Sequence, residues 1–249
     1  MQIVHERCCG VDVHKEKLVA CLFSGRKKEV RDFGTMTDDI LQLWEWLKEA
    51  ECEVVAMEST GVYWKPVYNI LEEKGMTIIV VNAQHIKAVP GRKSDVKDAE
   101  WIADLTRHGL VKASYIPSRE QRELRETTRY RQSLVEERAR EFNRIQGMLE
   151  GANIKLCSVV SDISGKSGMA ILHALAHGQT DPSTLCGLAQ GRLVEKVEQL
   201  RRALKGSIAI HQMRLLHLSV RHVEELSCLI DELDEEIKKK LNQQPRKSS

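Results

Sequence analysis

The stretch CCGVDVHKEKLVACLFSGRKKEVRDF (residues 8–33) decides the fold, because three short apolar runs follow one another in it without an intervening helix. The runs Cys8–Val13, Leu18–Phe23 and around Val30–Phe33 each predict a strand, and a glycine followed by three basic residues marks the turn between the second and the third. We therefore predict that the chain opens with an antiparallel meander.

The rest of the N-terminal half alternates strands with helices. The predicted elements are a helix at 38–50 with Thr37 as its N-cap, a strand at 54–57, a helix at 62–74, a strand at 77–81, and a helix from Asp95 to about His108 capped by Ser94. A meander followed by two strands that helices separate is the ribonuclease-H-like (RuvC-like) order of an α/β domain. An ordinary doubly wound sheet is the alternative, and the opening meander argues against it.

Beyond Pro117 the composition changes to long, charged helices. Residues 119–150 keep one narrow apolar stripe (Val135, Ala139, Phe142, Ile145, Leu149). Near the end, apolar residues step by four and three (Leu216, Val220, Val223, Leu226, Ile230, Leu233, Ile237), which predicts a coiled-coil hairpin or an oligomer seam. We predict a ribonuclease-H-like domain at 1–115 and a helical, coiled-coil region at 116–249, with short helices at 151–207 and a disordered tail at 243–249.

Bulk composition restricts the environment more than the partner. The net charge of +2 gives no overall sign of a nucleic-acid partner, so such a partner has to be argued from local clusters. The seven cysteines form no CxxC pair and are typical of a reduced compartment. No apolar run approaches the ~18 residues of a membrane span. We expect a soluble, cytoplasmic protein with no membrane association.

Four carboxylates stand out by their places in the predicted elements. Asp12 lies inside the first strand, opposite its apolar neighbours, and Glu58 directly follows the buried strand VVAM, at the edge where ligands bind in open α/β sheets. Asp95 and Asp98, three residues apart at a helix start, project from one face. Singly, each acid is an ordinary strand or helix-terminus residue. Together, they predict a site for paired Mg²⁺ or Mn²⁺ ions that act on phosphodiesters.

At these residues the sequence resembles the DEDD-type insertion-sequence transposases. The resemblance is carried by GVDVHK (10–15), MESTGVYWKPV (57–67), VVNAQHIKAVPGRKSDVKDAEWIADLTRHGL (80–110) and ELRETTRYRQSLVEERAREFNRIQGMLEGANIKL (123–156), and it extends over residues 5 to 240. It implies a RuvC-like N-terminal domain in which Asp12, Glu58, Asp95 and Asp98 are the catalytic, metal-binding set.

The resemblance also implies partners and a mode of action. Members of the family are recombinases, some guided by a bridge RNA, so we expect the DNA of a mobile element and its target as substrates, a guide RNA as a further partner, and a homo-oligomer assembled through the coiled coil. The family's C-terminal domain supplies a catalytic serine. No such segment follows the heptad region in this sequence, so we expect the chain to lack that domain, as a fragment or the product of a split or disrupted gene.

Basic residues near the acids predict contacts with nucleic acid. Lys15, Arg92 and Lys93 flank the four carboxylates in sequence, where they can hold phosphates. Arg129 and Arg131 lie in a helix rich in arginine, and we predict them as further contacts with RNA or DNA. Interleaved glutamates leave self-paired, solvated faces as the alternative for that helix.

Three weaker patterns have plain structural alternatives. Tyr63 and Trp64 suit either base stacking or core packing. His173 and His177 have zinc-ligand spacing, but the nearby sequence supplies no further ligand. SGKSG (164–168) is similar to a phosphate loop, yet Val160 stands where the pattern requires glycine, so we interpret it as an ordinary loop.

Two competing functions remain open at the level of sequence. An actin-like ATPase or sugar kinase shares the core fold, but it favours glycine- and threonine-rich phosphate loops where this chain has His14 and Lys15. A truncated, non-catalytic transposase that binds DNA or RNA and oligomerises is the second alternative. The leading hypothesis is the N-terminal part of a metal-dependent DNA transposase.

Overall fold

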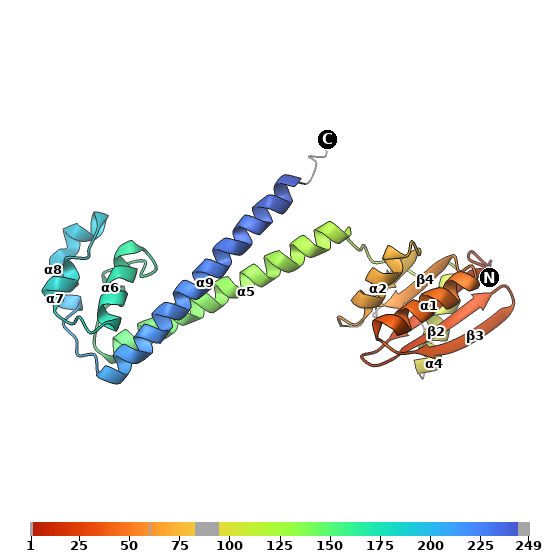
Figure 1. Cartoon of the computed structure of the whole chain (residues 1–249), viewed down its shortest axis with the longest axis horizontal. Helices are drawn as coiled ribbons and strands as arrows, with labels where there is room; N and C mark the ends of the chain where they lie inside the picture. Colours follow the sequence, from red (N-terminus) through yellow and green to blue (C-terminus); the bar gives the residue numbers. More distant parts are fainter. Residues whose placement is uncertain (1, 60, 83–94, 244–249) are drawn as a thin grey trace. The chain divides into compact units, whose positions relative to one another are not determined.

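A computed structural model describes residues 2–59, 61–82 and 95–243, with the backbone alone for 95–97 and 243 (Figure 1). The chain divides into two compact units, Met1–Pro117 and Ser118–Ser249. The first unit is built on a sheet and the second on helices, and each is described by itself. We call them the sheet unit and the helical unit.

The sheet unit has five strands in the order β3-β2-β1-β4-β5. They are β1 (Arg7–Val13), β2 (Leu18–Ser24), β3 (Lys27–Phe33), β4 (Val54–Glu58) and β5 (Ile78–Val81). The first three pair antiparallel, whereas β4 lies parallel to both β1 and β5. This order confirms the ribonuclease-H-like prediction, because an ordinary doubly wound sheet does not open with an antiparallel meander.

Helices cover both faces of this sheet. Figure 1 shows α1 (Thr37–Glu49) and α2 (Trp64–Glu73) on one face and α4 (Asp95–Arg107) on the other. Because side chains alternate along a strand, Val11 of β1 packs with Leu43 of α1 and Leu71 of α2, whereas Gly10 faces α4. The central strand β1 therefore presents an apolar row to one layer and a different row to the other.

The start of α1 differs from the sequence prediction. Thr37 is the first helical residue and Met36 is the N-cap. The backbone N–H of Met36 donates to Oδ2 of Asp39 at 3.1 Å, so an acid three residues into the helix satisfies this donor where a threonine cap was expected. Ser94, the predicted cap of α4, lies outside the described residues.

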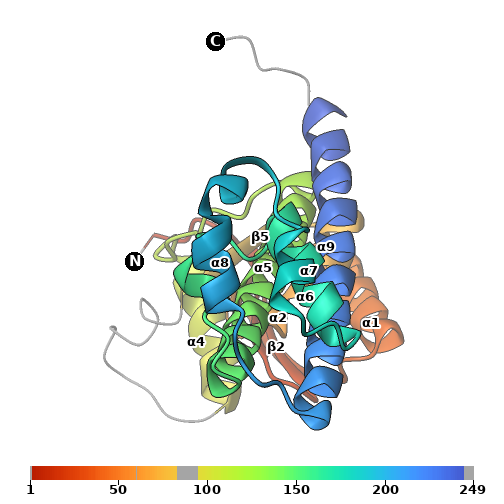
Figure 2. The same cartoon turned by 90° about the vertical axis from the view of Figure 1, so that its left-hand side faces the viewer.

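The helical unit is organised around two long helices. Its elements are α5 (Arg119–Gly151), η1 (Leu156–Ser158), α6 (Lys166–Ala176), α7 (Pro182–Cys186), η2 (Gly191–Lys196), α8 (Val197–Ala203) and α9 (Ile210–Gln243). Helices α5 and α9 pack antiparallel, since Arg131 pairs with Asp234 and Arg138 with Ser227. Helices α6, α7 and α8 gather where α5 ends and α9 begins (Figures 1 and 2).

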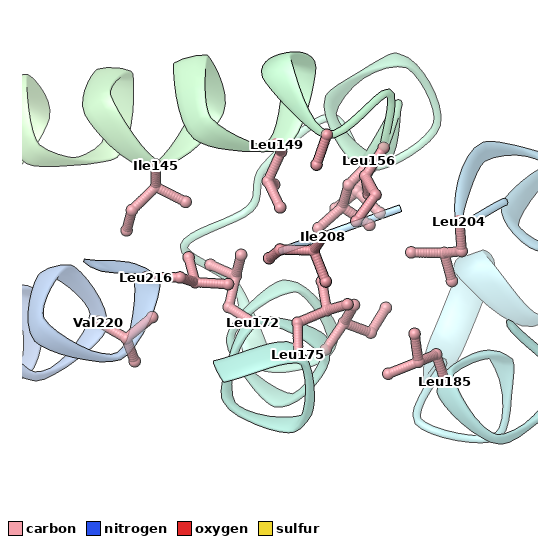
Figure 3. Close-up of a cluster of buried hydrophobic side chains, with 14 of the residues drawn as sticks. Ile145, Leu149, Leu156, Leu172, Leu175, Leu185, Leu204, Ile208, Leu216 and Val220 are labelled. Carbon is pink, nitrogen blue, oxygen red and sulfur yellow. The ribbon is translucent and has the colours of Figure 1, made fainter. Parts of the chain in front are cut away.

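The apolar stripes of α5 and α9 meet in one core. Ile145 and Leu149 of α5 pack with Leu216 and Val220 of α9, and α6 adds further leucines (Figure 3). The heptad positions of α9 thus pack against α5 of the same chain, and association between copies stays a prediction. The predicted stripe of α5 was wrong at Ala139, which is exposed.

Three further features concern the cysteines, the helices and the C-terminal end of α9. All seven cysteines carry free thiols. Among the described helices, none combines the length and apolar composition needed to cross a bilayer. Gln243, with which the predicted tail begins, is the last residue of α9, and residues 244–249 lie outside the described part of the chain.

Candidate active site

Asp12 is a buried carboxylate on the central strand of the sheet. It pairs with Val19 of β2 across the antiparallel ladder, and only 6% of its surface is exposed. Its neighbours Val11 and Val13 belong to the core under α1 and α2, so Asp12 points to the α4 face. Taking a carboxylate out of water costs free energy unless other groups stabilise its charge. A carboxylate at this position therefore lowers the stability of the fold, which indicates a functional role.

Glu58 lies beside Asp12 at the carboxyl edge of the parallel strands. The register of β1 and β4 ends with the pair Val11 and Met57, so Asp12 and Glu58 are the next residues on each strand. Both partners of that pair belong to the core under α1 and α2, which places Asp12 and Glu58 together on the opposite face. Glu58 is the final residue of β4, which runs one residue further than the predicted strand, and it is also buried.

Helix α4 brings a third acid to the same edge. A Cβ added to Gly10 would lie 2.3 Å from the nitrogen of Ala103 and 2.4 Å from the oxygen of Ala99, so the helix backbone rests directly on β1. Cys8, further back along the strand, donates to the oxygen of Ala103 at 3.6 Å. The helix thus runs antiparallel to β1, and its N-terminal turn, with Asp98, approaches the Asp12 end.

The acids act on one another electrostatically. Burial raises the pKa of the Asp12 carboxyl above its ordinary value, and the charges of Asp98 and Glu58 raise it further. The charge and hydrogen bond of His14 lower the same pKa. Three carboxylates from β1, β4 and α4 therefore share one electrostatic environment, and their role as a metal-binding set stays a prediction.

Asp95 opens α4, three residues before Asp98. Its side chain lies outside the described part of the structure, so its place in the quartet stays a prediction. Arg92 and Lys93, the predicted phosphate contacts before this helix, also lie outside the described residues.

His14 is a functional candidate that the sequence reasoning missed. Its Nε2 lies 3.0 Å from Oδ2 of Asp12, and its side chain is 44% exposed. His14 stands two residues after Asp12 but directly after the end of β1 at Val13, so strand spacing alone does not determine where its side chain lies. His14 fixes the orientation of the Asp12 carboxylate at the rim of the site.

Carboxylate oxygens at this edge suit a hard divalent cation. Within residues 2–59, 61–82 and 95–243, no three His, Cys, Asp or Glu side chains converge as a ready metal cage. Because the side chain of Asp95 is not among those described, the complete set of four has not been tested. Of the four predicted acids, Asp12, Glu58 and Asp98 are those whose side chains the structure describes.

The other predicted nucleic-acid contacts differ in whether their side chains already have a partner within the chain. Lys15 is exposed next to His14, and its backbone oxygen accepts a hydrogen bond from Thr35 at 3.1 Å. Arg129 is exposed on α5. Arg131 forms a two-point ion pair with Asp234 of α9, so a nucleic acid would have to compete with an existing partner there.

The weaker patterns divide between core and surface. Trp64 is part of the sheet-unit core and stacks edge-on against Tyr68, with centroids 5.7 Å apart, whereas Tyr63 is 42% exposed. His173 lies 2.8 Å from Glu224 of α9, an acid 51 residues away in sequence. His177 packs its ring against that of His217.

Comparisons with known proteins bear on the matched part of the chain. Residues 9–154 match the model of the IS110-type DEDD transposases, and this range contains all four predicted acids. Among solved structures, T. thermophilus RuvC in complex with a Holliday junction substrate is 16% identical, covers 44% of this chain and 100% of that chain, and has a TM-score of 0.34. No curated protein matches the sequence. The fold assignment rests on the strand order.

Proposed function

The chain belongs to the IS110-type DEDD transposase family, and from that premise we propose that Asp12, Glu58, Asp95 and Asp98 bind Mg²⁺ or Mn²⁺ and act in the cleavage and exchange of DNA strands. The observation that carries the proposal is the meeting of Asp12 and Glu58 on one face at the carboxyl edge, with the charge of Asp98 acting on the same carboxylate. Like charges held together at a buried edge repel one another, and a bound cation reverses that cost.

Each side chain has a distinct task in this proposal. Asp12 and Glu58, held by the two parallel strands, supply fixed oxygen ligands, and α4 supplies Asp95 and Asp98 from its first turn. His14 holds the Asp12 carboxylate by its hydrogen bond, and Lys15 is placed to contact a phosphate. Divalent ions at such a site activate the attacking oxygen and stabilise the leaving oxygen of a phosphodiester.

Nucleic acid is the partner class that this chemistry requires. We propose DNA as the substrate, with Arg129 and Lys15 among the backbone contacts, and a guide RNA as a further partner. Contacts of this kind add to affinity without reading sequence and weaken as salt rises. We also propose that copies of the chain associate through the helical unit.

The test measures metal binding and DNA cleavage in the purified full chain. Calorimetric titration with Mn²⁺ should give binding that Asp12→Asn and Asp98→Asn weaken by about a hundredfold or more. Nicking of supercoiled plasmid should fall in the same variants. Asp104→Asn is the matched control, because Asp104 lies in α4 with a 47% exposed side chain, away from the acidic edge. Loss of metal binding in Asp104→Asn alone would contradict the assignment.

A non-catalytic binding role is the second candidate, since Lys15 and Arg129 are exposed cations that can contact phosphates without a metal. It predicts that wild-type protein binds DNA or RNA but nicks nothing in Mn²⁺, and that Asp12→Asn leaves nucleic-acid affinity unchanged. Metal-dependent nicking that Asp12→Asn abolishes would exclude it.

A further inference from the structure

The helical unit contains a cavity that the acidic site does not use. Its volume is about 670 Å³, and its walls are the segment before and at the start of α6 and the segment of η2. Pockets of roughly 300–1,000 Å³ are of the size that takes small ligands or parts of larger ones. The wall includes residues 165–168 of SGKSG, which as sequence alone was interpreted as an ordinary loop.

Three cations line this cavity from both walls. Lys166 comes from the start of α6, and Arg192 and Lys196 come from η2; all three are exposed. In the described part of the chain these three side chains have no carboxylate partner within ion-pair distance, unlike Arg131 on Asp234 or Arg144 on Glu141. Cations that gather around a hollow without partners form a site for an anion.

Two carboxylates also line the cavity, and they do not neutralise it. Asp162 accepts hydrogen bonds through Oδ1 from the backbone N–H of Ser164 at 2.9 Å and from its hydroxyl at 2.6 Å. These bonds lower the pKa of Asp162 and orient its ionised carboxylate toward the turn. Glu195 is exposed on η2. Three cations and two carboxylates therefore leave the lining of the cavity with a net positive charge.

The two walls are tied together. The backbone N–H of Gln190, just before η2, donates to the hydroxyl of Ser167 in the first turn of α6 at 2.9 Å. A Cβ added to Gly168 would lie 2.3 Å from the oxygen of Ile163, so the loop presses on the helix start. Lys166 and Arg192 are therefore held on opposite sides of one hollow by contacts that do not involve their own charges.

We propose that this cavity binds phosphate groups, and that their source is the backbone of a nucleic-acid strand. The cations suit phosphate oxygens, and the serine hydroxyl and helix start add donors at the same wall. The inference rests on the proposed function in one respect, which is that nucleic acid is the chain's substrate class. A free nucleotide has the same phosphate chemistry and is the other source to be distinguished.

The experiment measures binding of a fluorescein-labelled single-stranded oligonucleotide to the full chain by anisotropy, in EDTA, over a range of salt concentrations. The site variant carries Lys166→Gln, Arg192→Gln and Lys196→Gln. The control variant carries Lys205→Gln, Arg214→Gln and Lys239→Gln, which removes the same charge from other exposed positions of the helical unit. Circular dichroism checks that both variants stay folded.

The site variant should bind at least about tenfold more weakly at low salt, and the slope of log affinity against log salt should fall by about two, since each phosphate contact to a single strand contributes about 0.7. The control variant should change either quantity much less. Equal losses in both variants would overturn the site in favour of general charge attraction. Absence of oligonucleotide binding in the wild type would instead remove the proposed function.

A second arm separates the two sources of phosphate. ATP and inorganic phosphate compete against the labelled oligonucleotide on the wild-type chain. Weak competition at millimolar concentration supports a strand as the source. Micromolar binding of ATP that the site variant loses would assign the cavity to a free nucleotide and overturn the strand.

Discussion

The two units place their ionisable side chains in opposite ways. In the sheet unit, Asp12 and Glu58 are buried next to each other, and the strongest compensation that Asp12 receives comes from one histidine. In the helical unit, a cation and an anion pair at the surface, as Arg131 and Asp234 do with side chains 31% and 34% exposed. Surface pairs of this kind cost little and stabilise little, whereas buried like charges cost stability. The buried acids are therefore the feature to explain by function.

The two units also differ in the kind of contact that holds them together. The sheet unit depends on close backbone contact between β1 and α4, which Gly10 permits. The helical unit depends on side-chain packing between α5, α6 and α9 around Leu149. All four tryptophans belong to the sheet unit, so tryptophan fluorescence reports its unfolding, while far-ultraviolet circular dichroism is dominated by the long helices. The units can thus be followed separately.

The largest expected effect is that of Gly10→Ala. The new methyl group would meet backbone atoms of Ala99 and Ala103 at 2.3–2.4 Å, and backbone cannot yield as a flexible side chain does. We expect a loss of about 3 kcal/mol or more in the stability of the sheet unit. Urea denaturation followed by fluorescence should show it, while the dichroism of the helical unit keeps its midpoint. An unchanged fluorescence midpoint would mean that α4 does not rest on β1.

Leu149→Ala should give the complementary result. Leu149 is 1% exposed in the core that joins α5, α6 and α9, and removing a buried leucine side chain costs about 2–5 kcal/mol. The dichroism transition should move to lower urea and the fluorescence transition should stay. If the two probes shift together in both variants, the chain unfolds as one cooperative body and the comparison between units fails.

The fold was predictable because its signals are local. Short continuous apolar runs define strands such as Leu18–Ser24, and helical spacing of apolar residues defines α9. Helix ends were less predictable. Thr37 looked like the cap of α1, but Asp39 already satisfies the donor at Met36, and only the geometry of the turn reveals this.

The candidate site was predictable where the place of a single residue in a strand or helix indicates its role. Glu58 at a strand end is visible in the sequence, whereas the hydrogen bond of His14 to Asp12 depends on how the chain leaves β1. Contacts between distant segments that no repeat or motif marks could not be predicted. Arg192 reaches the cavity of Lys166 only because the chain returns to α6. Such contacts follow from tertiary packing, which one sequence does not encode in any short pattern.

Asp12→Asn tests the cost of the buried acid directly. Because burial and neighbouring charges raise the native pKa of Asp12, the unfolded chain gives up this proton at lower pH than the folded chain does. The contribution of the Asp12 carboxyl to the free energy of unfolding therefore falls as pH rises from its ordinary pKa of 3.8 through its raised pKa in the folded chain. In EDTA the asparagine variant should be more stable than wild type at pH 7, and the gain should vanish below about pH 3.8.

In Mg²⁺ the wild-type sheet unit should be more stable than the Asp12→Asn variant, the reverse of the order expected in EDTA at pH 7. A cation that binds the native acids stabilises the wild type by mass action and does little for Asp12→Asn. Fluorescence-monitored urea titrations with and without Mg²⁺ measure both effects. A variant that is less stable than wild type in EDTA at pH 7 would show that Asp12 serves the fold rather than a ligand.

The smallest expected effect is a gain in the helical unit. Gly147 is exposed inside α5, and a Cβ added there would meet nothing within 4 Å. Alanine at that position removes backbone freedom from the unfolded chain, so Gly147→Ala should add about 0.5–1 kcal/mol. Gly178→Ala is the matched control of opposite sign, because Gly178 has φ +87° directly after α6 and alanine is strained there. Dichroism-monitored urea midpoints should move in opposite directions for the two variants. A loss in Gly147→Ala would place an unseen contact on α5 and make that surface, rather than the acidic edge, the next one to explain.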